Sequence, residues 1–489
     1  MYLLLEKVGI HGKMFMALNA MYSEVKSAVR IGTKITEYFE CMSGVKQGCI
    51  LSPLLFSLFL AELNAELEGS TAQGIDIFAD PIGVLLLMYA DDLALVADNV
   101  KDLQRKINCL EMYCEKWGLT VNMSKTKVVV FKNGGFNRQT EKWTYKGDQI
   151  QVVADYCYLG VIFGSTLNWA KCVKNLSSKA KKAMAGIKRL HRTLGSIPVS
   201  TLFHIFDTKI KPILLYGSEV WGFKKYEDIE KVQVNFCKTI LGVGRDVKNK
   251  IALGECGRFP IYIDSYMRLI KYWYKILAIN DNRLPKQCYK MLYEQDLSGR
   301  KNWATSIKNI LYTSGFGVVW ENQGVGNTDI FLKEFRQRLE DIYRQDWCSS
   351  LENDTEYMTY HSTIERARYV SVLNDRTLRR TFCLIRCNRL KLKATSCFRE
   401  TTTNVNCEIC NLEEVEDMCH FLLVCPSLAH IRRKYIPLYY HRFPTSFKVD
   451  LLLNKTSNSD KLCINVSCFV EKAYRERLKR LENNKNILN

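Results

Sequence analysis

The chain has 489 residues, enough for two to four domains. Nearly half of the residues are hydrophobic and a quarter are charged, a composition that excludes an intrinsically disordered protein. The formal net charge of +19 favours a polyanion as the partner, with nucleic acid ahead of an acidic membrane surface. The alternative at this stage is a basic protein whose charge only keeps it soluble.

The cysteines and the apolar segments indicate where the chain resides. Its 19 cysteines are scattered and lack the spacing of a disulfide framework. Residues 1–13 lack the features of a signal peptide, and the most apolar segments, 51–61 and 82–97, are too interrupted to span a bilayer. We therefore expect an intracellular protein, in the nucleus or cytoplasm, with reduced thiols and no membrane partner.

Helices and short strands alternate in the predicted elements of the first third. Apolar spacing predicts a helix over 1–30, and Ser52-Pro53 predicts the start of a second helix, with Ser52 as its N-cap and Gly69 as its end. Residues 83–97 predict a tight β-hairpin around Ala90-Asp91-Asp92. The remaining predicted elements are a helix over 99–117 that stops at Gly118 and strands over 128–131 and 156–163.

From about residue 170 the pattern becomes helical. Residues 171–194 form an amphipathic pattern whose second face carries Lys174, Lys181, Lys188 and Arg192. That face suits a phosphate backbone, although lysines that only solubilise a helix are the commoner explanation of such a pattern. Residues 260–395 are predicted to be mostly helical and hold no recognisable motif, and 454–460 are predicted as a loop before a final basic helix.

Tyr89-Ala90-Asp91-Asp92 is the sharpest chemical signal. Nucleotidyl transfer uses two Mg²⁺ ions, which prefer carboxylate oxygens delivered together at a rigid point. Successive side chains of a strand point to opposite faces of the sheet, but at a hairpin tip two adjacent side chains can reach the same site. The competing interpretation is an ordinary exposed turn, and by composition this four-residue pattern arises by chance in about one chain in twenty.

A glycine-containing stretch precedes this hairpin. Gly44 and Gly48 allow the backbone to approach a ligand closely, and the Gln47 amide can hydrogen-bond to a base or a sugar. An ordinary glycine-rich loop before a buried helix explains the same residues.

The order of four segments resembles the palm motifs of non-LTR (LINE-type) retrotransposon reverse transcriptases. The segments are GVKQGCILSPLLF (44–56), YADDLAL (89–95), WGLTVNMSKTKVVVF (117–131) and YLGVIF (158–163). PILLYGSEVWG (212–222) is similar to the segment that follows the palm in this family. The resemblance covers residues 1–260, and a group II intron maturase, which shares the Y-A-D-D hairpin, is not expected to continue into this last segment.

The resemblance implies roles for individual residues. Asp91 is the principal Mg²⁺ ligand and Asp92 a weaker or structural one, while Gly44, Gln47, Gly48 and Tyr89 position the template and the nucleotide. Lys125 matches the lysine of the family's N-x-x-K-T pattern and supplies a proton to the leaving pyrophosphate. Tyr158, Leu159 and Gly160 match the primer grip.

A cysteine–histidine cluster lies near the C-terminus. Cys407, Cys410, His420 and Cys425 have residue types that suit a tetrahedral structural Zn²⁺ site, although thiols on a helix without a metal, with Cys419 as a competing ligand, are the alternative. The pattern also resembles the C-terminal cysteine–histidine motif of many LINE proteins, a nucleic-acid-binding module in that family.

The family's first palm motif, a strand with a metal-bridging aspartate, precedes a helix that 4–13 resemble. We therefore expect an N-terminally truncated polypeptide that lacks this carboxylate and is catalytically inactive or nearly so.

The resulting prediction is an α+β fold. It consists of an incomplete right-hand polymerase palm (1–165), a helical thumb (166–260), a helical C-terminal region (261–398), a zinc-knuckle-like module (399–435) and a basic helical tail (436–489). The predicted function is that of a reverse transcriptase polypeptide, with an RNA template, a DNA primer or target and deoxynucleoside triphosphates as partners. The alternative is a non-catalytic, nucleic-acid-binding retrotransposon remnant.

Overall fold

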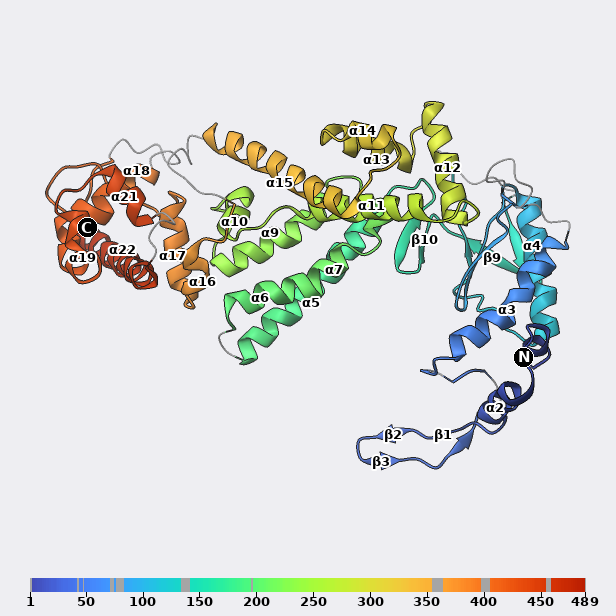
Figure 1. Ribbon diagram of the computed structural model, residues 1–489. Coiled ribbons are helices and arrows are strands. Elements are labelled where there is room, and N and C mark those ends of the chain that lie inside the picture. The colour runs from blue at the N-terminus through green and yellow to red at the C-terminus, as the bar shows by residue number, and fades with distance from the viewer. Residues whose placement is uncertain are drawn as a thin grey trace. The chain divides into compact units, whose positions relative to one another are not determined.

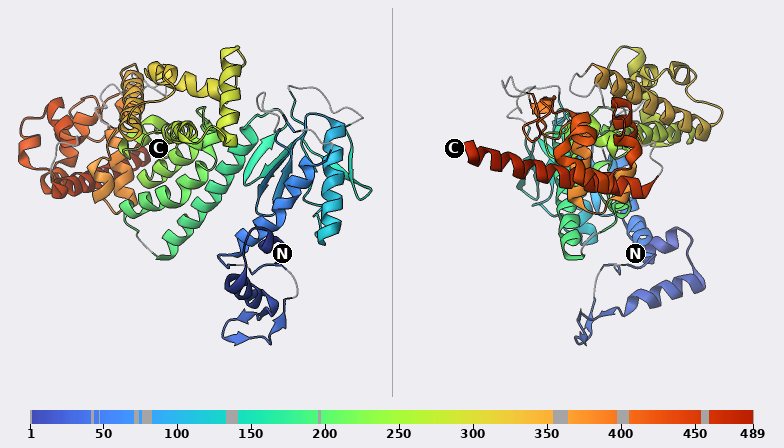
Figure 2. Two further views of the ribbon diagram at one scale, coloured as in Figure 1. Left: turned by 45° about the vertical axis from the view of Figure 1, so that its right-hand side comes forward. Right: turned by 90° about the vertical axis from the view of Figure 1, so that its left-hand side faces the viewer.

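The chain folds into two compact units. The computed structural model describes residues 2–41, 44–46, 48–70, 74–75, 83–132, 141–194, 197–353, 364–396, 405–453 and 459–488. The first unit holds residues 1–158 and 163–168, and the second holds 159–162 and 169–489. The described strands lie in the first unit or at its boundary, whereas the second is built of helices (Figure 1, Figure 2). None of the described helices is both long and apolar enough to cross a bilayer.

Two short helices and four short strands form the N-terminal part of the first unit. The helices are α1 (Tyr2–Lys7) and α2 (Gly12–Ser23), and the strands pair as β1 (Lys26–Ser27) with β4 (Phe39–Glu40) and β2 (Arg30–Ile31) with β3 (Lys34–Ile35). The prediction of one helix over 1–30 is therefore wrong. Gly9 and Gly12 adopt φ values of +83° and +61°, a left-handed conformation that ends α1 and separates it from α2.

Two helices and a hairpin form the first core of this unit. The helices are α3 (Ser52–Glu68) and α4 (Val100–Trp117), and the hairpin consists of β5 (Leu86–Tyr89) and β6 (Asp92–Leu95). Leu60, Leu63 and Leu67 of α3 pack against Leu110 and Tyr113 of α4, and leucines of both hairpin strands pack against this cluster. The predicted hairpin and the helix over 99–117 are thus confirmed.

The ends of these helices agree only partly with the sequence prediction. The Asn99 side chain accepts the Asp102 N–H at 2.9 Å, and Gly118 ends α4 with a φ of +65°, as predicted. The prediction of Ser52 as an N-cap is wrong, because Leu51 occupies the cap position of α3. The Ser52 hydroxyl instead donates to the Lys46 carbonyl at 2.6 Å, which ties the helix to the preceding glycine-containing stretch.

A small sheet covers another side of α4. Its strand order is β7 (Lys127–Val128), β9 (Asp148–Val152) and β8 (Trp143–Tyr145), and Ile107 of α4 packs with its buried residues. The strand predicted over 128–131 is shorter than expected, since pairing stops at Val128. The strand predicted over 156–163 is in fact β10 (Asp155–Tyr158) and β11 (Val161–Gly164), because Leu159 and Gly160 turn the chain with positive φ values.

From α5 (Ala170–Leu194) onward the second unit continues helix after helix, as predicted. Trp273 lies at the centre of an aromatic core that includes Trp320 and Phe335. The elements up to residue 352 are α6 (Val199–Ile205), η1 (Phe206–Ile210), α7 (Lys211–Leu214), α8 (Ser218–Trp221), α9 (Glu227–Leu241), α10 (Asn249–Glu255), α11 (Ile261–Ala278), α12 (Leu284–Leu297), α13 (Trp303–Thr313), α14 (Gly317–Glu321) and α15 (Thr328–Glu352).

The C-terminal part is organised around the last helix, α22 (Asp460–Leu488), which matches the predicted basic helix. It packs against α16, α17 and α19. The other elements here are α16 (Arg368–Val372), α17 (Arg376–Arg386), α18 (Lys393–Ser396), η3 (His420–Val424), η4 (Pro426–Leu428), α19 (Ala429–Tyr435), α20 (Leu438–His441) and α21 (Ser446–Leu453). Arg477 of α22 makes two 2.6 Å hydrogen bonds to the Glu416 carboxylate, and both side chains are buried.

Removing one partner of this buried ion pair should destabilise the C-terminal part. Arg477→Met is expected to lower its free energy of unfolding by about 3–5 kcal/mol, because Glu416 would keep a buried charge without its main partner. Urea-dependent hydrogen–deuterium exchange of α22 peptides measures this change. Arg480→Met is the matched control, since the Arg480–Glu476 pair on the same helix is only partly buried and should be worth less than about 1 kcal/mol. Equal losses in the two variants would contradict the assignment.

Candidate functional site

The tip of the β5–β6 hairpin carries the two candidate catalytic carboxylates. Tyr89 pairs with Asp92, so Ala90 and Asp91 form a two-residue loop. Ala90 has a φ of +54°, the left-handed conformation that such a tight connection requires. Tyr89, Asp91 and Asp92 are all exposed, so both carboxylates can be reached by a ligand at the tip.

A buried lysine anchors the base of the hairpin. Lys106 of α4 has no exposed side-chain surface, and its Nζ lies 2.8 Å from Asp102 Oδ2. The same ammonium donates to the carbonyl of Val96, just after β6, at 2.6 Å. The carboxylate and the carbonyl together compensate the Lys106 charge, which would be costly to bury alone. The contact to Val96 also fixes the end of β6 against α4. Sequence reasoning missed this residue, because an Asp–Lys pair four residues apart usually lies on an exposed helix face.

The predicted primer-grip residues lie at the β10–β11 turn. Burial and the negative charge of Asp92 both raise the pKa of the Tyr158 hydroxyl, so this tyrosine lies within electrostatic reach of the hairpin. Gly160 has a φ of +82°, and a Cβ at this position would lie 3.0 Å from the Tyr216 ring. The Tyr216 hydroxyl donates to the Leu159 carbonyl at 2.8 Å. The 158–163 and 212–222 motifs, far apart in the sequence, are therefore in direct contact.

The remaining predicted palm residues are only partly described. Gly44 and Gly48 adopt φ values of +89° and +84°, conformations that favour glycine, whereas Gln47 lies outside the described residues. Lys125 is exposed in a turn in which its N–H donates to the Asn122 carbonyl at 3.1 Å.

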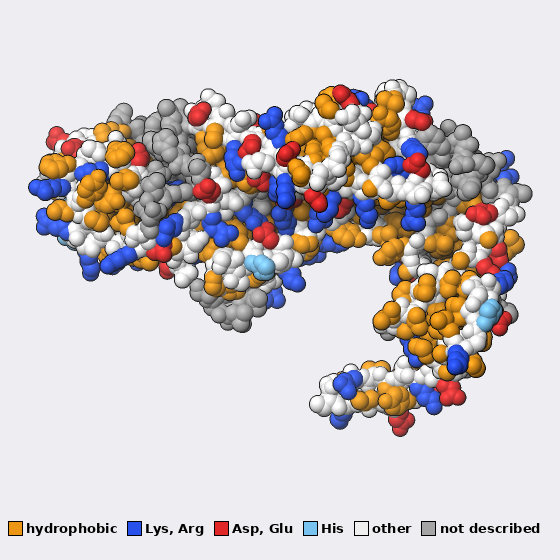
Figure 3. Space-filling view, in the orientation of Figure 1, with side chains coloured by type: hydrophobic (Ala, Val, Ile, Leu, Met, Phe, Trp, Pro, Cys, Tyr) orange, Lys and Arg blue, Asp and Glu red, His pale blue; other side chains and the backbone are white. Residues whose placement is uncertain are grey.

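The first predicted basic residues of α5 are exposed. Lys174 and Lys181 face solvent, while Val173, Leu176 and Ala180 of the predicted apolar stripe are buried. The side chains of Lys188 and Arg192 lie outside the described part of the chain. Figure 3 shows many further Lys and Arg side chains across the second unit, in agreement with the basic composition.

The four predicted zinc ligands come together in the second unit. One ligand atom from each of Cys407, Cys410, His420 and Cys425 lies within 4.8 Å of the others. His420 Nε2 is 3.4 Å from Cys410 Sγ, while His420 Nδ1 is 3.0 Å from a carboxylate oxygen of Glu414. A carboxylate on Nδ1 orients the imidazole so that Nε2 faces the thiols, the usual arrangement around a metal-binding histidine. Cys419 is not part of this group, and sequence reasoning missed Glu414.

Hydrogen bonds within the cluster shift the pKa values of its members. A hydrogen bond with Cys425 and burial raise the pKa of the Cys407 thiol to about 12, whereas the same hydrogen bond lowers the pKa of Cys425. Burial opposes protonation of His420, but hydrogen bonds to Cys407 and Glu414 outweigh it and raise the pKa of His420 to about 9. The donor set of three thiols and one imidazole fits Zn²⁺, and binding of the metal would release these protons.

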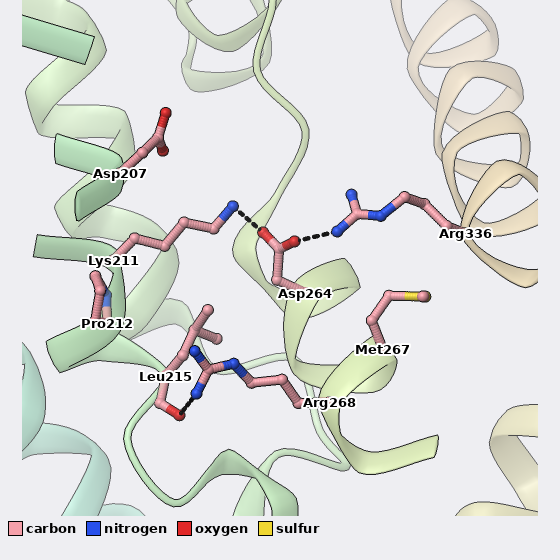
Figure 4. A pocket seen from close by; sticks show the side chains of 8 residues that line it. All are labelled: Asp207, Lys211, Pro212, Leu215, Asp264, Met267, Arg268 and Arg336. Atoms are coloured by element: carbon pink, nitrogen blue, oxygen red, sulfur yellow. Dashed lines mark hydrogen bonds and ion pairs between the residues drawn. The ribbon is translucent and has the colours of Figure 1, made fainter. Parts of the chain in front are cut away.

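A cavity of about 290 Å³ also lies in the second unit, lined by residues of η1, α7, α11 and α15 (Figure 4). Asp264 accepts from both Lys211 and Arg336 across it. Asp207 accepts from Arg258 at 2.8 Å and 2.5 Å, and Arg268 donates to the Leu215 carbonyl at 3.0 Å. Both carboxylates of the cavity, Asp207 and Asp264, are therefore paired with cations and join neighbouring elements of the second unit.

The comparisons with known proteins agree on one family. Residues 5–176 match the family described as reverse transcriptase (RNA-dependent DNA polymerase). The chain is 26% identical over 198 residues to the probable RNA-directed DNA polymerase from transposon BS of Drosophila melanogaster, covering 39% of this chain and 21% of the relative. It is 25% identical over 260 residues to the RNA-directed DNA polymerase from mobile element jockey of Drosophila funebris, covering 50% of this chain and 27% of the relative.

A third relative comes from a retrotransposable element of Popillia japonica. The Pol polyprotein from type-1 retrotransposable element R2 of Popillia japonica is 27% identical over 204 residues, covering 39% of this chain and 31% of the relative. The chain thus spans between 21% and 31% of the length of these three relatives. The matched region contains the Y-A-D-D hairpin, the 117–131 segment and the β10–β11 turn. The chain is thus similar to the reverse transcriptases of non-LTR retrotransposons, and the match over residues 5–176 implies a palm-type polymerase fold there.

Proposed function

We propose that this chain contributes the carboxylate hairpin, the primer grip and a nucleic-acid-binding thumb to an RNA-directed DNA polymerase. The observation that carries the proposal is the exposed pair of carboxylates, Asp91 and Asp92, at the tip of an anchored two-residue hairpin. Mg²⁺ bound there would activate the primer 3′-hydroxyl and hold the triphosphate. The substrates are an RNA template, a DNA primer and deoxynucleoside triphosphates.

The surrounding residues have supporting roles in this proposal. Gly44, Gln47, Gly48 and Tyr89 position the template and the nucleotide, and Lys125 donates a proton to the leaving pyrophosphate. The turn at Leu159 and Gly160 and the side chain of Tyr158 hold the primer end. The negative charge of Asp92 raises the pKa of the Tyr158 hydroxyl, which agrees with a position near the hairpin.

Nucleic acid away from the hairpin is bound in two further places. Lys174, Lys181, Lys188 and Arg192 contact the phosphate backbone along α5, where the first two are exposed opposite a buried apolar stripe. The cluster of Cys407, Cys410, His420 and Cys425 holds a structural Zn²⁺ that orders the segment before α19.

A non-catalytic, nucleic-acid-binding role is the second candidate. Among the described residues, no further acidic, histidine or cysteine group joins Asp91 and Asp92 to make a set of three possible ligands. Both candidates expect salt-sensitive binding to nucleic acid, so polymerase activity is what separates them.

Primer extension tests the catalytic assignment. The 489-residue polypeptide alone is expected to extend an oligo(dT) primer on poly(rA) at or near background, because no third described ligand group joins Asp91 and Asp92 and two carboxylates neutralise the charge of two metal ions poorly. In any polypeptide that contains this chain and does extend the primer, Asp91→Asn should lower the rate at least about a hundredfold.

Asp98→Asn is the matched control for this test, since Asp98 is exposed shortly after the same hairpin and should be replaceable without loss of rate. Full activity of Asp91→Asn would refute the assignment of the hairpin. If the 489-residue chain extends the primer strongly and Asp91→Asn abolishes this activity, only the expected inactivity is refuted.

Metal analysis tests the proposed zinc site. The purified chain should contain about one Zn²⁺, and Cys425→Ser should lose it together with the protection of the 405–435 backbone from hydrogen exchange. Glu414→Gln should weaken zinc binding by about 10–100-fold, because the imidazole loses its orienting carboxylate.

Cys419→Ser provides the control, because its thiol is a cysteine of the same segment outside the cluster. Retention of zinc by Cys425→Ser, or an equal loss in Cys419→Ser, would show that the ligand set is wrong.

A further inference from the structure

Tyr22 of α2 lies against the glycine-containing stretch that precedes α3. The half-buried residues of α2 are Phe15, Leu18 and Tyr22, whereas the other residues of this helix are exposed. Side chains three and four positions apart share one face of a helix, so these residues form the face that α2 turns toward the rest of the first unit. Tyr22 stands at the C-terminal end of this face, in contact with the stretch 44–52.

The Tyr22 hydroxyl joins two residues of this stretch. It lies 3.3 Å from Ser52 Oγ and 3.6 Å from Cys49 Sγ. The Ser52 hydroxyl has a single proton, which it donates to the Lys46 carbonyl at 2.6 Å, so Tyr22 is the donor in its contacts with Ser52 and Cys49. Lys46 Nζ also lies 5.7 Å from the centre of the Tyr22 ring, within the range of a cation–π contact. Both the ring and the hydroxyl of this tyrosine therefore contact the stretch.

The backbone of the stretch holds itself only weakly. The Lys46 carbonyl accepts the Cys49 N–H at 3.3 Å, and the Cys49 carbonyl accepts the Ser52 N–H at 3.3 Å, both longer than an ordinary N–H···O bond. Gly44 and Gly48 add backbone freedom, and both adopt positive φ values. The contacts from α2, which come from 27 and 30 residues earlier in the chain, therefore supply a constraint that the stretch itself lacks.

Stability of the fold is the competing explanation of these contacts. Tyr22 is only half-buried, and Lys46 and Gly48 are exposed beside it, so the hydrogen bonds of Tyr22 lie close to solvent. A hydrogen bond in such a place contributes little to folding, because water offers the same groups an alternative partner. It can still decide which conformation an exposed turn adopts, and this turn is open to a ligand.

We propose that Tyr22 is a positioning residue for the template and the nucleotide, because its hydroxyl holds the turn over 46–52 in the conformation that receives them. This inference rests on the proposed function, in which the 44–48 segment positions the template and the nucleotide. Tyr22 touches neither of them and acts through Ser52 and Cys49. Its loss should weaken contact between the template and this stretch and leave contacts elsewhere on the chain unchanged.

The reactivity of Cys49 tests the contact in the 489-residue chain. The hydrogen bond from Tyr22 lowers the pKa of the Cys49 thiol, and backbone N–H groups of Leu51 and Ser52 lower it further. Tyr22→Phe keeps the ring and the backbone donors but removes the hydroxyl, so the apparent pKa of Cys49 should rise. The measurement is the pH dependence of alkylation by iodoacetamide, followed on the Cys49 peptide by mass spectrometry.

Tyr38→Phe is the matched control for this measurement, because the Tyr38 side chain is 73% exposed and should not affect the thiol. An apparent pKa of Cys49 that is the same in Tyr22→Phe and in the parent chain would overturn the proposal. The apparent pKa is preferred to a single alkylation rate, since a loosened turn also changes the access of the reagent.

Photocrosslinking tests the positioning role without catalysis. An RNA template with 4-thiouridine opposite the incoming nucleotide is annealed to a DNA primer that ends in a dideoxynucleotide, and the full chain is irradiated with this duplex, Mg²⁺ and dATP. The parent chain should crosslink within 44–52. In Tyr22→Phe the yield of this crosslink should fall about two- to tenfold, the effect expected of one lost hydrogen bond, while crosslinks to the second unit and the thermal unfolding stay unchanged.

The possible outcomes separate this inference from the proposed function. An equal 44–52 crosslink in Tyr22→Phe and in the parent chain would overturn the role of Tyr22 and leave the proposed function intact. A parent chain that crosslinks only outside 44–52 would contradict the role proposed for that stretch, and this inference with it. A fall in all crosslinks together with earlier unfolding would show that Tyr22 is only structural, which also overturns the proposal.

Discussion

The ion pair between Lys106 and Asp102 is the interaction on which the geometry of the candidate catalytic hairpin depends. A lysine with no exposed surface is tolerated in a core only when its charge is matched and its protons are bound. Here the ammonium also holds the carbonyl of Val96, so the chain leaves β6 in a fixed direction. The leucines of the hairpin attach it to α3 and α4, and this polar contact holds the end of the strand against α4.

A second constraint joins motifs that are far apart in the chain. The turn at Leu159 and Gly160 receives a hydrogen bond from Tyr216, and a Cβ at position 160 would lie only 3.0 Å from the Tyr216 ring. The proposed primer grip therefore has its shape set by the segment after the palm. The C-terminal elements are likewise joined by a contact between distant parts of the chain, because Glu416 and Arg477 connect the segment of the cysteine cluster to α22.

The sequence predicted those elements whose signals are local. The helix over 99–117 has an asparagine cap, a regular apolar spacing and a terminal glycine, and all three act as expected. The prediction of one helix over 1–30 was wrong because it rested on apolar spacing and gave too little weight to Gly9 and Gly12. The positive φ values of these two glycines break the helix. The single strand over 156–163 failed similarly, since Leu159 gives no sign in sequence that it will adopt a positive φ.

The residues of the candidate sites also differ in whether the sequence alone could predict them. The sequence predicted the residues that lie in short motifs, because the residue types of such motifs indicate their chemistry. These are Asp91 and Asp92 and the four residues of the cysteine–histidine cluster. Lys106 and Glu414 could not be predicted, because their roles depend on burial and on partners that only the folded chain supplies. Ser52 illustrates the reverse case, in which a familiar cap residue is used for a contact to Lys46.

The contact between Gly160 and Tyr216 has an evolutionary consequence. The ring lies 3.0 Å from the position that the first side-chain carbon of a larger residue at 160 would take, and its hydroxyl donates to the neighbouring carbonyl. Neither position can drift on its own, because a smaller residue at 216 abandons the turn and a larger one at 160 displaces the ring. Descendants of this sequence that keep a working turn should therefore carry correlated residues at these two sites, 56 positions apart in the chain.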